Sequence, residues 1–100
     1  MQFIPSVGPG YDDSRIRPWN SHTRRARDHG AVYNRMWSAA VALQPTVVSI
    51  TSWNEWGEGT QIEPVRPYVT PGGTKLDDYE PEGSDLYLTL TKEWANKLNK

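Results

Sequence analysis

The order of apolar patterns along the chain constrains its fold most, because a strand, a loop and a helix occur twice in succession. Buried strands are predicted over residues 2–7 and over the β-branched run 46–53. Amphipathic helices are predicted over residues 31–44 and 85–98. Strands that alternate with helices in this way are typical of an α/β fold with a parallel sheet and crossover helices.

Each predicted helix carries an apolar stripe that we expect to face the core. The members of each stripe recur three or four positions apart, as the residues on one helix face do. The stripes consist of Tyr33, Met36, Trp37, Ala40 and Val41 in the first helix and Leu86, Leu90, Trp94 and Leu98 in the second.

The chain is short for a self-sufficient α/β domain. It has 100 residues and a mean hydropathy of -0.74, and two strand–helix units alone leave two open sheet edges. We therefore expect further α/β units upstream, in the parent chain. One unit of a (β/α)8 barrel takes roughly 30 to 40 residues, and barrel active sites lie in the loops after the strands. Both long loops predicted here, over residues 11–30 and 54–71, follow strands.

Composition excludes several classes of function. The net charge of -1 gives no field that would attract nucleic acid, and without cysteine the chain has no disulfide or thiolate-bound zinc. No apolar run approaches the ~20 residues that cross a bilayer, and no targeting segment is recognisable. His22 and His29 lack metal-ligand spacing. For Arg24, Arg25 and Arg27, a solvated loop or structural contacts are favoured over a nucleic-acid patch.

Glu55 and Glu58 are the candidate catalytic carboxyl groups. They are three residues apart, directly after the second predicted strand. In a helical turn this spacing places Cβ atoms about 5–6 Å apart, and retaining glycosidases hold their two carboxyl groups about 5–5.5 Å apart. Trp53 and Trp56 could form stacking walls, and an indole beside a carboxyl group can raise its pKa by desolvation. A solvated Glu-x-x-Glu pair is the structural alternative.

The longest motif in the chain is SITSWNEWGEGTQIE, residues 49–63. It resembles the signature of glycoside hydrolase family 99, and the resemblance continues on both sides of it. Other segments similar to the family are PSVGPGY at 5–11, IRPWN at 16–20 and LYLTLTKEW at 86–94. Two positions depart from the family's animal members, which carry His where Gly57 stands and Phe where Trp53 stands.

The resemblance implies that residues 1–100 are the carboxy-terminal two βα units of a (β/α)8 barrel. It implies retaining, endo-acting cleavage of α-1,2-mannosidic bonds in glucosylated high-mannose N-glycans, without metal or cofactor. Glu55 would be the base that activates the sugar's own 2-hydroxyl, and Glu58 the general acid and base. Substrate contacts are expected from Trp53, Asn54 and Trp56, and from the first-loop residues Arg17, Trp19 and Asn20. Animal members of the family work in the Golgi.

Three further interpretations remain open at this point. The chain could belong to a related barrel of bacterial polysaccharide processing, to a non-catalytic carbohydrate-binding protein, or to a structural α/β unit. For Asn54 the alternatives are a ligand for a sugar or carboxylate and a cap for a helical start, whereas Glu63 is expected to be structural. In the absence of the upstream barrel units, we expect the isolated chain to be inactive and poorly folded.

Overall fold

Two parallel strands and two helices form the frame of the protein. The computed structural model describes residues 4–12, 24–56, 58–65, 71 and 78–98. Strand β1 (Ser6–Val7) pairs in parallel with β4 (Ser49–Ile50). Helix α1 (Ala31–Ala42) connects the two strands, and α2 (Leu86–Leu98) follows the second. The predicted α/β order is thus confirmed, although within the described residues the paired strands are shorter than the predicted ranges.

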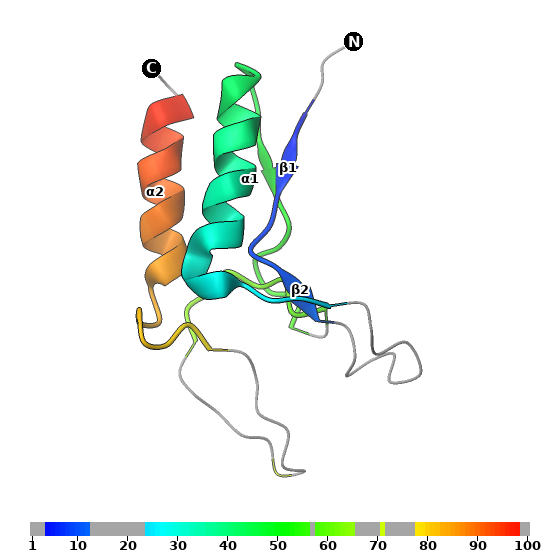
Figure 1. Ribbon diagram of the computed structural model, residues 1–100, viewed down its shortest axis with the longest axis vertical. Helices are drawn as coiled ribbons and strands as arrows, with labels where there is room; N and C mark the ends of the chain where they lie inside the picture. Colours follow the sequence, from blue (N-terminus) through cyan, green and yellow to red (C-terminus); the bar gives the residue numbers. More distant parts are fainter. Residues whose placement is uncertain (1–3, 13–23, 57, 66–70, 72–77, 99–100) are drawn as a thin grey trace.

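Both helices lie on the same side of the strand pair. Helix α1 lies between α2 and the strands, and both helices run in the direction opposite to the strands (Figure 1). The carboxyl ends of β1 and β4 and the amino ends of α1 and α2 therefore meet at one end of the molecule. In a βα barrel this is the end at which active sites are built.

The first long loop contains regular structure of its own. Strand β2 (Tyr11–Asp12) pairs antiparallel with β3 (Arg24–Arg25), and the 3-10 helix η2 (Asp28–Gly30) leads into α1. The prediction of a long loop over residues 11–30 is therefore wrong for this part. Two residues per strand are too few to produce a readable alternation of apolar and polar side chains.

The core is built mainly from aromatic rings. Tyr33 packs edge-on against Trp37 and Tyr87, with ring centroids 6.3 and 5.2 Å away, and Tyr79 packs edge-on against Tyr87 at 4.7 Å. Trp37 also stacks on Trp94 of α2 at 6.3 Å. Edge-to-face and offset-stacked rings stabilise beyond their buried area. These contacts hold α2 against α1 and bring the start of α2 close to the loop that follows β4.

The predicted stripes are correct for most positions and wrong for Met36. This side chain is 40% exposed and borders an open groove that Leu43 and, from the β1 side, Pro5 and Ser6 also line. On α2 the predicted members Leu86, Leu90 and Trp94 are half-buried against the core. The most deeply buried side chain of that helix is instead Tyr87, at 1% exposure.

The approach of α2 to α1 depends on a glycine. Gly30 has φ +94° and ends η2, so its backbone favours a residue without a Cβ atom. A Cβ atom added here would lie 3.1 Å from Cδ1 of Leu90. The predicted helix start at Gly30 is confirmed, and the glycine also lets the two helices pack closely.

Candidate functional site

The candidate catalytic residues lie on the segment directly after β4. We call residues 52–63 the glutamate segment. Trp53, Asn54, Glu55 and Glu58 are exposed on it, and Trp56 is half-buried. The other predicted site residues, Arg17, Trp19 and Asn20, lie outside the described residues, as does Gly57.

The two glutamates lie on a series of turns and not on a helical turn. The backbone N–H of Gly59 donates to the Trp56 carbonyl at 3.1 Å, and the N–H of Thr60 reaches the Glu55 carbonyl at 3.3 Å. A helix would instead join residues four apart. The possible helical start, and with it the cap role considered for Asn54, is therefore not observed in the described residues of this segment. The contacts that fix these turns determine where the two glutamates lie.

The Glu55 end of the segment is fixed from within. Ser52 Oγ accepts the backbone N–H of Glu55 at 3.0 Å and lies 2.8 Å from the hydroxyl oxygen of Thr60. The Ser52 N–H also donates to the Thr60 carbonyl at 2.8 Å. Thr60 is buried and Ser52 half-buried, so the bond between their hydroxyl groups is partly sheltered from water, whereas the bond from the Glu55 N–H is exposed. Ser52 thus closes the loop and sets the backbone from which the Glu55 side chain projects.

The Glu58 end is fixed by residues of the first loop. The backbone N–H of Asp12 in β2 donates to the Glu58 carbonyl at 2.8 Å. The Nη2 of Arg27 donates to the Gly59 carbonyl at 2.9 Å. Two consecutive carbonyl groups are therefore held by residues that lie far away in the sequence. Arg27 and Gly59, for example, are separated by 32 positions.

Gly59 makes this close approach possible. Its φ is +68°, in the left-handed region. A Cβ atom at this position would lie 2.9 Å from the Asp12 nitrogen and 3.1 Å from the Asp12 oxygen. The backbone of β2 thus occupies the space that any side chain would need, and only glycine fits between Glu58 and Thr60.

The two tryptophans of the segment have different environments. Trp53 is 51% exposed, as a ring that stacks on a sugar has to be. Trp56 packs against the core, and its Nε1–H donates to Glu63 Oε1 at 2.6 Å. This bond gives Glu63 the structural role expected from the sequence. It also makes Trp56 a support of the segment, with its side chain only half-exposed.

Tyr79 fixes the far end of the glutamate segment. Its hydroxyl group shares its one proton between the carbonyl oxygens of Gln61 and Glu63, at 3.1 and 2.7 Å. Burial raises the pKa of Tyr79 to about 12, against the opposing effect of the Arg27 charge. The hydroxyl therefore stays protonated and remains a donor well above neutral pH. Sequence reasoning missed Tyr79, because it lies in a turn-rich stretch without periodicity.

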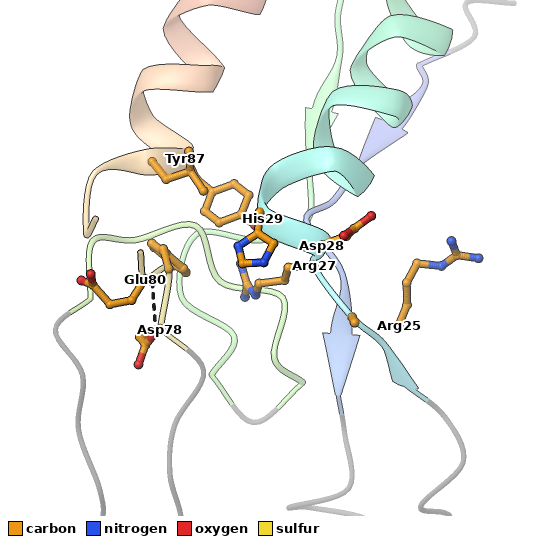
Figure 2. Close-up of a pocket in the computed structure, with 10 residues that line it drawn as sticks. Arg25, Arg27, Asp28, His29, Asp78, Glu80 and Tyr87 are labelled. Atoms are coloured by element: carbon orange, nitrogen blue, oxygen red, sulfur yellow. Dashed lines mark hydrogen bonds between the residues drawn. The ribbon is translucent and has the colours of Figure 1, made fainter. Parts of the chain in front are cut away.

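A cavity of about 370 Å³ lies where the starts of α1 and α2 meet. Its wall combines positive and negative side chains from η2, β3 and the approach to α2 (Figure 2). The labelled members of the wall are Arg25, Arg27, Asp28, His29, Asp78, Glu80 and Tyr87. Neither Glu55 nor Glu58 lines it. No sequence pattern indicates this cavity, because its wall comes from two segments far apart in the chain.

The described residues show neither a grouped set of metal ligands nor a membrane-spanning helix. Within the residues that the structure describes, no three His, Cys, Asp or Glu side chains are grouped as they would be around a metal ion. Across the same residues, neither helix has the length and apolar character needed to cross a membrane.

Comparison with known proteins gives consistent matches over the whole chain. The sequence model of Glycosyl hydrolase family 99 matches residues 1–100. The chain is 53% identical to the mouse "Glycoprotein endo-alpha-1,2-mannosidase-like protein" and 51% identical to the rat "Glycoprotein endo-alpha-1,2-mannosidase". Each alignment covers 100% of this chain, but only 22% of the mouse protein and 21% of the rat protein. The chain thus spans about a fifth of the length of these relatives.

The solved structures agree with the sequence matches. The GH99 endo-alpha-mannosidase of Bacteroides thetaiotaomicron superposes with a TM-score of 0.91 at 47% identity, over 98% of this chain and 28% of the bacterial one. Its complex with BIS-TRIS-Propane gives a TM-score of 0.90 over 30% of the bacterial chain. The prediction of two βα units of a (β/α)8 barrel is confirmed. The chain belongs to glycosyl hydrolase family 99.

Proposed function

We propose that this chain supplies the two catalytic carboxyl groups of a retaining, endo-acting glycosidase. The observation that carries the proposal is that Glu55 and Glu58 are both exposed on one fixed segment, at the carboxyl end of β4. Family membership supports hydrolysis of a glycosidic bond. The names of the relatives support an internal α-1,2-mannosidic bond as the one cleaved.

The mechanism assigns a separate task to each glutamate. Glu55 takes the proton of the 2-hydroxyl of the mannose that is cleaved, and the 2-oxygen attacks the anomeric carbon. The bond to the leaving oxygen breaks as Glu58 donates its proton to that oxygen, leaving a 1,2-anhydro sugar. Glu58, now a carboxylate, takes a proton from water, the water opens the anhydro ring at the anomeric carbon, and Glu55 returns the proton to the 2-oxygen. Two inversions at one carbon give retention, and one carboxyl acts as base while the other acts as acid.

Substrate contacts follow from the exposure of the neighbouring side chains. Trp53 offers an indole face to the sugar ring, and the exposed Asn54 offers an amide to its hydroxyl groups. Trp56 contributes less of its ring, because it is tied to Glu63. Arg17, Trp19 and Asn20 complete the proposed contacts from the first loop.

The activity is assigned to the parent protein. In our proposal the chain is the carboxy-terminal part of its barrel domain, and the remaining βα units carry the rest of the substrate cleft. The isolated chain would then be inactive. For an animal parent, the expected setting is N-glycan processing at the Golgi membrane or in its lumen, with a glucosylated high-mannose glycan as substrate.

The test uses the parent protein and a glucosylated high-mannose N-glycan. We expect release of an α-1,3-glucosyl-mannose disaccharide, and loss of most of the rate in Glu55→Gln and in Glu58→Gln. Binding of the glycan should persist in both variants, because the exposed Trp53 and Asn54 remain. If the parent protein binds the glycan, releases no disaccharide, and binds equally well with both glutamates replaced, it is a carbohydrate-binding protein instead.

A further inference from the structure

Arg27 occupies an environment that is unusual for a loop arginine. Its guanidinium carbon lies 5.1 Å from the ring centroids of both Tyr79 and Tyr87. The side chain is half-buried, in contrast to the exposed Arg25 two residues earlier. Cation–π contacts of this kind favour a guanidinium over an ammonium group, since the flat guanidinium stacks on the rings. The two tyrosines thus form a socket, and we call them the tyrosine socket.

The socket aims Arg27 at the backbone that carries Glu58. Nη2 donates to the carbonyl of Gly59, the residue after Glu58, at 2.9 Å. Asp12 holds the preceding carbonyl at 2.8 Å. The tyrosine socket is itself tied to the same segment, because the Tyr79 hydroxyl donates to Gln61 and Glu63. Arg27 therefore connects the amino end of α1, the start of α2 and the Glu58 turn.

A buried guanidinium group destabilises the fold compared with an apolar side chain at the same position, so packing alone does not explain Arg27. Among the described residues, Nε and Nη1 of Arg27 are buried and make no hydrogen bond of ordinary geometry, although the guanidinium interacts with the hydroxyl groups of Tyr79 and Tyr87. Burying N–H groups without partners destabilises a fold, and an apolar side chain of similar length would avoid that cost. Local departures of this kind concentrate at functional sites. A role in aligning a catalytic turn accounts for the charge, whereas space filling does not.

We propose that Arg27 is a positioning residue for Glu58, acting through the Gly59 carbonyl. The inference rests on the proposed function, in which Glu58 protonates the leaving oxygen. Displacement of a catalytic group by 1 Å can cost about 100-fold in rate. Loss of Arg27 should therefore affect steps that need the Glu58 proton more than steps that do not.

The leaving group separates these two kinds of step. We compare kcat/KM of the parent protein on the mannose-linked oligosaccharide with kcat/KM on the same disaccharide joined to a nitrophenol, which departs without a proton. For Arg27→Met we expect a loss of about 10- to 100-fold on the first substrate and a much smaller loss on the second. Arg35→Met is the matched control, since Arg35 is exposed on α1, and it should change neither value.

Two more variants separate positioning from folding. Arg27→Lys keeps a positive charge in the tyrosine socket but loses the flat donor group, so its selective loss should lie between wild type and Arg27→Met. In Arg27→Ala, added guanidinium ion should restore part of the lost rate on the oligosaccharide, because Arg27 lines the 370 Å³ cavity through which the ion could enter. Methylammonium should restore less.

The outcomes distinguish this inference from the proposed function. Glu58→Gln should show the same dependence on the leaving group as Arg27→Met, and more strongly. Equal losses on both substrates for Arg27→Met, or no loss on either, overturn the positioning role while Glu58→Gln still shows the dependence. If Glu58→Gln lacks the dependence, the acid role of Glu58 itself fails, and the positioning role fails with it.

Discussion

Replacing Gly59 by alanine tests how tightly the Glu58 turn is held against β2. Alanine at φ +68° costs about 1–2 kcal/mol, because its Cβ atom approaches the carbonyl oxygen in the left-handed region. The new Cβ atom would also lie 2.9 Å from the Asp12 nitrogen, and overpacking of this kind costs about 1–3 kcal/mol more. We therefore expect Gly59→Ala to lower the free energy of unfolding by about 2–5 kcal/mol.

Gly83 provides a matched control for the backbone cost. It also has positive φ, at +100°, yet no other part of the chain that the structure describes lies within 4 Å of a Cβ atom built there. Gly83→Ala should therefore show only the conformational cost, of about 1–3 kcal/mol. Any excess in Gly59→Ala measures the contact with Asp12.

The assay combines chemical denaturation of the parent protein with kcat/KM on the oligosaccharide. Gly59→Ala should lose activity beyond what its unfolded fraction explains, because relief of the clash moves the turn and lengthens the 2.8 Å bond from Asp12 to the Glu58 carbonyl. Gly83→Ala should keep the activity of its folded fraction. Equal effects of the two variants on stability and on activity would refute the close contact as the reason for Gly59.

Two other predictions concern the supports of the glutamate segment. Ser52→Ala removes the acceptor of the Glu55 N–H and the hydrogen-bond partner of Thr60. It should lower the free energy of unfolding by about 1–3 kcal/mol and should change kcat more than KM. Ser52→Thr keeps the hydroxyl and should retain most activity. For Tyr79, a folded-state pKa of about 12 against 10.0 in the unfolded chain stabilises the fold below pH 10. Unfolding measured against pH should therefore show on the order of 3 kcal/mol lost between pH 10 and 12, and Tyr79→Phe should remove that loss.

The frame of the fold could be predicted because it rests on local patterns. The helix predicted over residues 31–44 is observed as Ala31–Ala42, and the one over 85–98 as Leu86–Leu98. Periodicity marks such segments whatever their neighbours are. It failed at Met36, because three- and four-residue spacing places this residue on the stripe although the groove beside it stays open.

The supports of the site could not be predicted, because they join segments far apart in the sequence. In the sequence, Arg27 is one of three arginines clustered in a polar stretch. The residues that it contacts, Gly59, Tyr79 and Tyr87, lie 32 to 60 positions further along the chain. The glutamates themselves were found by position and by family resemblance. The helical turn used to judge their spacing is not observed in the described residues, because long-range bonds to β2 and Arg27 fix turns there instead.

The division of labour between the two glutamates is the central claim, and one comparison tests it directly. The kcat/KM of Glu55→Gln and of Glu58→Gln is measured in the parent protein on both the mannose-linked and the nitrophenol-linked substrate. We predict that Glu58→Gln recovers most of its activity when the leaving group needs no proton, whereas Glu55→Gln stays low on both substrates, because the 2-hydroxyl still needs a base. Recovery of Glu55→Gln but not of Glu58→Gln would contradict the assignment of roles, and full activity of both variants on both substrates would contradict catalysis by this pair.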